Sequence, residues 1–402
     1  MPAFPVRLGA AEETLIAQLK AAGADQAAER ITVAGLPTRR VEAYHYTDLK
    51  TLVRAIPPLA QAANEASAPA LRVAGAYVLS IVNGVVQNAA TAPQGVIVGK
   101  THGGVLTNRD DVIVNVSNGL TKEALTLTLE GTIAQVIQID HRIEAAAAHV
   151  ADALKIFASD DTNVVIFETF SGSDAAHVGN HATYLALGKN AVVTHVTIDL
   201  SAPATTHFAT NEYHLAEGAK LRTLVVHAGA NVSRTQLFPR MGGAGAHADV
   251  TGLNLVSEGQ HADITMETRH AVPHTTSQPL FKSITRGRSK SVIQGKLIVD
   301  RDAQKTDAKF MHQGLMLSDD AEILSKPELE IYADDVVCGH GSTCGKLDED
   351  SLFYLFSRGI PKAEAETMLV RGFIAELIDP IEDEALNEAL QGVVDGWLLD
   401  AK

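Results

Sequence analysis

The sequence has only two cysteines among its 402 residues, Cys338 and Cys344, and both lie in one short segment. A framework of several disulfides, the usual device of small secreted domains, is therefore excluded. In a reducing compartment, two cysteines so close together more often form a thiol or metal site than a structural bridge. The two thiols are thus the first candidate functional groups of the chain.

Aromatic residues and positive charges are also scarce. Aromatics make up 5% of the chain, so the core must be built mainly from Val, Ile, Leu and Ala. The 33 Lys and Arg residues are outnumbered by 48 Asp and Glu residues, which gives a net charge of -15. Because an acidic chain repels phosphate backbones, nucleic-acid binding is not expected.

Long apolar runs are missing as well. No run reaches the roughly 18 residues that a membrane-spanning helix needs. The first residues, MPAFPVRLGAAEETL, contain no apolar segment of the signal-peptide type. We therefore expect a cytoplasmic protein with no membrane attachment.

Both ends of the chain have helical patterns. Residues 11–30 are rich in Ala, Glu, Leu and Lys, which are good helix formers, and predict an N-terminal helical domain over residues 1–66. A C-terminal helical domain is predicted over residues 347–402, where apolar residues such as Leu386 and Leu390 recur at helical spacing. Such stripes either pack within the chain or form a docking surface for a partner.

The middle region, residues 67–346, has short alternating runs rich in β-branched residues and bounded by turn formers. The predicted strands are Tyr77–Val82, Val112–Val116, Leu125–Leu129, Val164–Glu168, Val192–Ile198, Leu221–Val226, Val250–Val256 and Ser291–Val299. The one helical stretch expected among them is the Ala-rich segment 142–157. A sandwich, a barrel or a β-helix would fit, and recurrent units of a turn and a short strand favour the β-helix.

Two other motifs are set aside. The segment Gly95–Thr101 resembles a phosphate loop, but only three residues separate its glycines where four are needed, so this chain is not expected to bind or hydrolyse a nucleotide. His270 and His274 have the spacing of a helical metal pair, but Pro273 lies between them. We interpret the two histidines as core or surface residues.

The segment Cys338-Gly-His340-Gly-Ser-Thr-Cys344 contains the only soft metal ligands that lie close together in the sequence. Thiolates and imidazoles suit zinc, copper and iron–sulfur centres. In an extended backbone Cys338 and His340 would share a face. The alternative is a buried strand cysteine beside a glycine turn. Because the segment supplies at most three donors, any metal site would be incomplete, transient or completed by another chain.

Around this segment the sequence resembles the SufB/SufD family. The resemblance rests on five stretches: Leu36–Asp48, Gly295–Ala308, Leu317–Glu322, Lys326–Gly341 and Ser357–Pro361. The short chain, the N-terminal motif and the histidine two residues after the cysteine are similar to SufD rather than SufB members. The resemblance implies a right-handed parallel β-helix flanked by N-terminal and C-terminal α-helical domains.

The resemblance also implies a function. The family's SufD members are non-catalytic subunits of the SUF scaffold for iron–sulfur cluster assembly. A SufB-like subunit would pair with the end of the β-helix, and a SufC-like ATPase would bind the C-terminal helices. A transient iron–sulfur cluster would be shared with SufB through His340 and Cys338. Cys344 departs from the family pattern and is either an additional ligand or incidental.

Some expectations concern what else the chain could do. Flavin is associated with SufB and is not expected on this chain, and a homodimer is possible when the chain is isolated. From the residues alone, two other classes stay open. They are a carbohydrate-active β-helix enzyme and a metal-transfer protein that uses the same segment.

Overall fold

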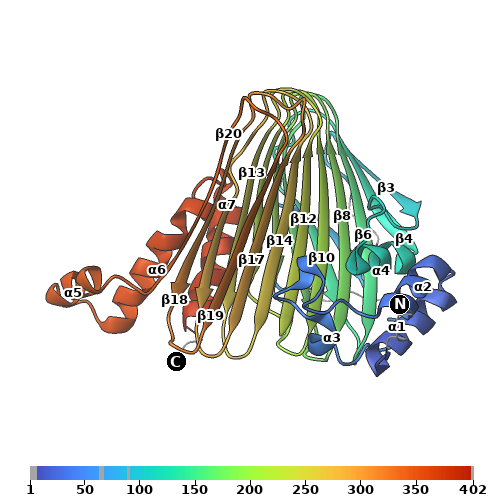
Figure 1. Ribbon diagram of the computed structural model, residues 1–402, viewed down its shortest axis with the longest axis horizontal. Coiled ribbons are helices and arrows are strands. Elements are labelled where there is room, and N and C mark those ends of the chain that lie inside the picture. Colours follow the sequence, from blue (N-terminus) through green and yellow to red (C-terminus); the bar gives the residue numbers. More distant parts are fainter. Residues whose placement is uncertain (1–6, 63–67, 88–90, 400–402) are drawn as a thin grey trace.

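The computed structural model describes residues 7–62, 68–87 and 91–399 (Figure 1). Its centre is a stack of long strands, with helices at both ends of the chain. The predicted boundary between residues 66 and 67 lies outside the described residues.

Within the described residues, the strands form two sheets. The first sheet has nine strands, in the order β19 (Glu322–Ile331), β17 (Lys290–Val299), β14 (His261–His270), β12 (Val232–Met241), β10 (Thr206–Leu215), β8 (Val178–Leu187), β6 (His149–Ala158), β4 (Glu123–Leu129) and β3 (Val96–His102). The second has eleven, in the order β15 (Thr276–Ser277), β18 (Asp307–Met316), β16 (Leu280–Thr285), β13 (His247–Val256), β11 (Lys220–His227), β9 (Val192–Asp199), β7 (Asn163–Gly172), β5 (Ile137–Ile143), β1 (Tyr77–Val82) and β2 (Val85–Val86), with β20 (Val337–Gly345) paired to β18.

The chain passes from one sheet to the other with almost every strand, so each turn of the chain adds a strand to both sheets. Neighbouring strands are parallel, apart from the antiparallel pairs β1–β2 and β3–β4. The result is a parallel β-solenoid of about eight turns, which confirms the predicted β-helix.

The turns differ in length although the strands stay in register. Val232 pairs with His261 and His261 pairs with Lys290, an offset of 29 residues each time. Lys290 then pairs with Glu322, an offset of 32 residues. The extra residues lie in the turns, which is why the sequence shows only an irregular repeat.

Alternate residues of every strand point into the interior between the sheets. This interior has two chemically different halves. One half is aliphatic, as the composition predicts; it includes Leu154, Leu185, Leu215, Leu221, Val250, Ile264 and Leu297. The other half is polar, and its buried side chains bond to one another. For example, Nδ1 of His227 lies 2.9 Å from Oδ1 of Asn254, whose Nδ2 lies 2.8 Å from Oγ of Ser291.

The N-terminal helices α1 (Ala10–Ala21), α2 (Asp25–Ala34) and α3 (Leu49–Leu52), with the short 3-10 helix η1 (Glu42–Tyr44), lie beside the first sheet. A buried arginine ties η1 to that sheet. Arg234 pairs with Asp263, donates to the carbonyl oxygen of Ala43 at 2.8 Å, and lies with its Cζ 4.3 Å from the ring centre of Tyr44. The Tyr44 hydroxyl donates to Asp111 at 2.7 Å.

The C-terminal helices are α5 (Glu349–Ser357), α6 (Lys362–Ile378) and α7 (Glu384–Leu399). The apolar stripes of α6 and α7 pack against the outer face of the second sheet; the helix residues include Val370, Ile374, Leu377, Leu386, Leu390, Val394 and Trp397, and the sheet residues include Val196, Leu224, Leu253, Ile284 and Leu315. These stripes therefore pack within the chain. Helix α5 projects away from the stack and buries none of its residues (Figure 1).

Two predicted elements were wrong. Residues Val112–Val116 were expected to form a strand but begin helix α4 (Val112–Leu120), because Asp111 caps the helix by accepting from the backbone N–H of Val114 at 3.1 Å. The segment 142–157, expected to be helical, is the end of β5, a turn and most of β6. Residues 145–148, all alanine, lie in the turn, and Ala151 and Ala153 adopt the strand conformation because β6 pairs along its whole length with β8.

Two of the motifs set aside on sequence can be placed. The segment Gly95–Thr101 runs through strand β3, where its residues pair with β4, so the glycines do not form a phosphate loop. His270 is fully buried, and its ring nitrogens lie 2.8 and 3.0 Å from the hydroxyls of Thr275 and Ser277. It is a core histidine, as interpreted. Over the described residues, no helix is long and apolar enough to span a membrane.

The close packing of the aliphatic half generates a first prediction. Gly295 lies on the inner face of β17, where an added Cβ would overlap the ring of Phe310. We expect Gly295→Ala to lower the free energy of unfolding by about 1–3 kcal/mol, the usual cost of overpacking a core. Urea denaturation followed by circular dichroism measures it.

Gly345→Ala is the matched control, because a Cβ added there would meet no atom within 4 Å. We expect its effect to stay within about 0.5 kcal/mol. Equal stability of the two variants would contradict the packing described for Gly295.

Candidate functional site

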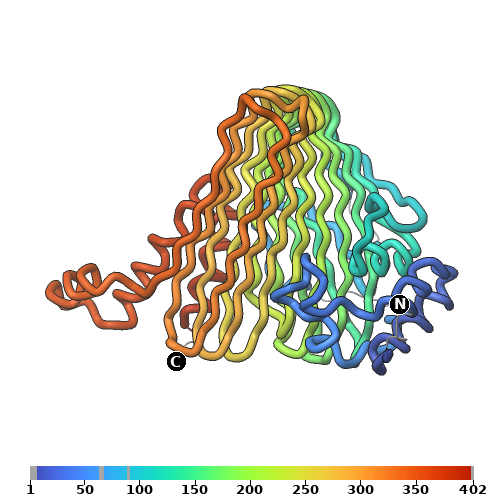
Figure 2. Tube along the Cα trace, in the orientation of Figure 1, coloured from blue at the N-terminus to red at the C-terminus, as the bar shows by residue number. Residues whose placement is uncertain are grey.

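The predicted site residues lie on β20, in the last coil of the solenoid. Among the described residues, β20 pairs only with β18, and β19 pairs only with β17. Both strands of this coil therefore have one edge with no neighbouring strand. The tube trace shows the coil, in orange, at one end of the stack (Figure 2). The site is thus at an open end of the solenoid.

The register places Cys338, His340 and Cys344 on the inward face of β20. They pair with Ala308, Phe310 and Gly314 of β18, respectively. Ala308 and Phe310 belong to the buried core. The three site residues therefore continue the inner columns by one layer, and no further coil of the described residues covers them.

The three side chains differ in burial and spacing. Cys338 is half-buried against the small cluster of Val299 and Ala303, whereas His340 and Cys344 are exposed. At ~3.3 Å per residue, the Cα atoms of Cys338 and His340 are ~7 Å apart, and those of His340 and Cys344 are ~13 Å apart. The strand thus places Cys338 and His340 within reach of one small metal centre and holds Cys344 away from it.

The surroundings of both thiols favour the neutral form over the thiolate. Burial raises the pKa of Cys338, partly offset by a hydrogen bond with the backbone of Ala308. Burial likewise raises the pKa of Cys344. Because a thiolate is the form that binds metal, a metal must displace a proton from either cysteine.

The opposite side of the same opening is apolar. A Cβ added at Gly314 would lie 2.8 Å from Cδ1 of Ile323, on β19, and 3.4 Å from Sγ of Cys344. Ile323 and Cys344 therefore lie close together across the end of the interior. Among the described residues, the exposed soft donors at this end are those of β20, and only Cys338 and His340 lie close together, so a four-coordinate centre here would need further ligands, which another chain could supply.

His312 lies one coil below and was not identified from the sequence. It is fully buried on β18 and pairs in register with Ser342. Its Nε2 lies 2.9 Å from Oγ of Ser283, while its Nδ1 has no hydrogen-bond partner among the described residues. His312 lies beside the site only because of the register between β18 and β20. No local sequence motif predicts this position.

Comparisons with known proteins show which family this chain resembles. The family model described as "SUF system FeS cluster assembly, SufBD core domain" matches residues 141–373. The chain is 27% identical over 385 residues to the iron–sulfur cluster assembly protein SufD of Escherichia coli, which covers 91% of this chain and 90% of that protein.

Other relatives match over a shorter length. An iron–sulfur cluster assembly SufBD family protein of Synechocystis is 32% identical over 54% of this chain and 48% of its own length. The chloroplastic protein ABCI7 of Arabidopsis thaliana is 27% identical over 60% of this chain and 52% of its own length. The match thus spans about half the length of these two relatives.

The different exposure of the thiols generates a second prediction. We expect iodoacetamide to alkylate the exposed Cys344 faster than the half-buried Cys338, as measured by mass spectrometry of peptides over time. Because burial raises the pKa of both thiols, both rates should still be rising at a pH where an ordinary thiol, with a pKa of about 8.5, has reached its plateau.

The single variants Cys338→Ser and Cys344→Ser assign each rate to one thiol. Equal rates for the two cysteines, or a plateau below pH 8.5, would contradict the described burial.

Proposed function

Because this chain belongs to the SufB/SufD family of the SUF system for iron–sulfur cluster assembly, we propose that it is the SufD-like subunit of a scaffold on which clusters are built. The observation that carries the proposal is the open last coil, where soft ligands on β20 lie beside two unpaired strand edges. We propose a scaffold with no catalytic activity of its own, working in the cytoplasm.

The partner at the open end is proposed to be a SufB-like subunit. Unpaired strand edges tend to pair with another chain, so the edges of β19 and β20 favour an end-to-end contact. A partner seated there would cover the exposed inner columns and supply the missing donors. When the partner is absent, two copies of this chain could pair through the same edges.

In this proposal His340 and Cys338 hold a transient iron–sulfur cluster together with groups of the partner. Their shared face and short separation along β20 support a joint role. Cys344 is assigned a lesser role as a ligand, since it lies farther along the strand. We assign no flavin and no nucleotide to this chain.

The C-terminal segment 347–402 is proposed as the docking domain for a SufC-like ATPase, beside a β-helix core over 67–346 and an N-terminal helical domain over 1–66. The stripes of α6 and α7 are buried within the chain, whereas α5 buries none of its residues. On α5, Phe353 is 72% exposed, Tyr354 56% and Phe356 41%. Exposed aromatic residues of this kind are typical of binding hot spots.

The role of His340 can be tested in the assembled complex. We expect His340→Ala to lower the iron and sulfide content of the co-purified complex at least severalfold, because a ligand of the cluster is lost. The variant should keep its circular dichroism spectrum and its SufB-like partner, because the side chain is exposed.

Ser342→Ala is the control, since Ser342 is also exposed and lies two residues along the same face. An unchanged cluster yield with His340→Ala, or an equal loss with Ser342→Ala, would rule out the assigned role.

Docking of the ATPase can be tested without disturbing the core. We expect the double variant Phe353→Ala with Phe356→Ala to weaken binding of a SufC-like ATPase more than about tenfold, as two aromatic anchors are truncated. Isothermal titration calorimetry with the full-length chain measures the affinity.

Ile97→Ala is the control, because Ile97 is an apolar residue of β3 that is 58% exposed on another part of the surface. Full affinity of the α5 variant would refute docking through this helix.

A further inference from the structure

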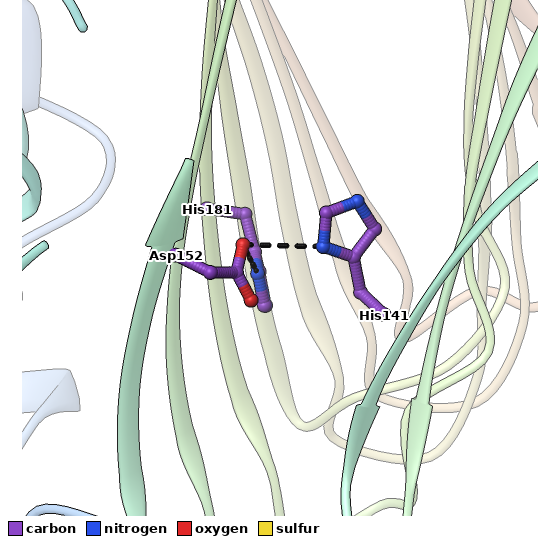
Figure 3. A group of neighbouring side chains, drawn as sticks. All are labelled: His141, Asp152 and His181. Atoms are coloured by element: carbon purple, nitrogen blue, oxygen red, sulfur yellow. Dashed lines mark hydrogen bonds and ion pairs between the residues drawn. The ribbon is translucent and has the colours of Figure 1, made fainter. Parts of the chain in front are cut away.

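Three side chains of the polar half meet between the two sheets, away from the last coil (Figure 3). His141 comes from β5 of the second sheet, while Asp152 and His181 come from β6 and β8 of the first. Nδ1 of His141 lies 3.1 Å from Oδ1 of Asp152, and Nδ1 of His181 lies 2.9 Å from the same oxygen. All three residues are buried, and one ligand atom of each lies within 4.8 Å of the others.

We propose that His141, Asp152 and His181 form a binding site for a divalent transition-metal ion such as Zn²⁺ or Fe²⁺, inside the solenoid. Two imidazole nitrogens and a carboxylate oxygen are a donor set that these ions favour. With bonds of about 2.0–2.1 Å, tetrahedral ligand atoms lie about 3.3 Å apart. The two nitrogens now lie 3.1 and 2.9 Å from the Asp152 oxygen, and the ligand atoms all lie within 4.8 Å of one another, so the side chains would shift to reach that spacing. A water molecule would complete the coordination.

The side chains that bond to the cluster are of the kind that usually hold metal-binding histidines in place. Nε2 of His141 lies 2.8 Å from Oε2 of Glu168, which is the contact by which a carboxylate orients a metal-bound histidine. Glu168 is itself fixed, since its Oε1 accepts from Thr183 at 2.9 Å and lies 2.7 Å from Nε2 of His195. Glu168 thus holds Nδ1 of His141 facing Asp152.

The charges at the site also favour a cation. Asp152 and Glu168 are both fully buried, and no described Lys or Arg forms a hydrogen bond or ion pair with them. Buried carboxylates need a compensating positive charge. A divalent ion bound by Nδ1 of His141, Nδ1 of His181 and Oδ1 of Asp152 would supply that charge.

The rings are held in place by their surroundings. The ring of Phe170 lies 4.6 Å, between ring centres, from those of both His141 and His181. A Cβ added at Gly179 would lie 2.5 Å from Nε2 of His181, so only glycine leaves room for this ring. The two ligands are therefore preorganised before any metal arrives.

Cobalt provides the test, because Co²⁺ replaces Zn²⁺ in such sites and its visible absorption reports four-coordinate ligands. The full-length chain is treated with a chelator, refolded with Co²⁺ and dialysed. We expect one Co²⁺ per chain, intense visible bands, and no thiolate charge-transfer band. The triple variant Cys338→Ser, His340→Ala and Cys344→Ser should keep this metal, which separates the interior site from β20 and from the proposed function.

Variants within the cluster complete the test. Asp152→Asn and His181→Gln should each weaken Co²⁺ binding by more than about 100-fold, and Glu168→Gln by about 10–100-fold. His227→Gln is the control, since His227 is another buried histidine of the polar half that makes no hydrogen bond to the cluster. Its Co²⁺ affinity should be unchanged.

Some outcomes would overturn the proposal even if a cluster variant failed to fold. They are a wild-type chain that retains no Co²⁺ or Zn²⁺ after refolding, and cobalt bound only through thiolates. Cobalt retained by a folded Asp152→Asn or His181→Gln variant would do the same. In each case the cluster would be a hydrogen-bonded network with a proton in place of the metal.

Discussion

The backbone hydrogen bonds between parallel strands are the constraint on which the rest of this structure depends. Over the part of the chain that the structure describes, every strand within the stack bonds to a neighbour on both sides, but the strands at the two ends have a neighbour on one side only. At the N-terminal end, the outermost strands β2 and β3 run antiparallel to their neighbours β1 and β4. At the C-terminal end, β19 and β20 run parallel to their neighbours, and no further strand of the described residues pairs with them. The candidate site lies at this C-terminal end.

Stacking in register also decides the chemistry of the interior. Residues that point inward at equivalent positions of successive coils lie directly above one another, so aliphatic side chains form one half and polar side chains the other. The polar half is stable because its members bond to each other across coils, as His227 and Asn254 do. A polar interior of this kind can hold ions or protons that an aliphatic core would exclude.

The sequence predicts the strands well where apolar residues alternate, as in Tyr77–Val82, which coincides with β1. It misleads at Val112–Val116, because a cap at Asp111 outweighs the strand preference of β-branched residues. Cys338 and His340 stand out because soft donors are neighbours in the sequence. His312, by contrast, lies beside the site because it pairs with Ser342, 30 residues farther along the chain, on the next coil. A contact between residues so far apart in the sequence leaves no local pattern.

Helices α6 and α7 pack along the second sheet from Val196 on β9 to Leu315 on β18. Their length is thus matched to a fixed number of coils. Removing one coil would shift the strands that follow it by about 4.8 Å along the stack. The apolar side chains of α6 and α7 would then no longer face their partners on the sheet. The turns can gain or lose residues freely, as the offsets of 29 and 32 show, because turns do not contribute to this match. Packing of the two helices therefore favours one number of coils, and with it one distance between the open end and the rest of the molecule.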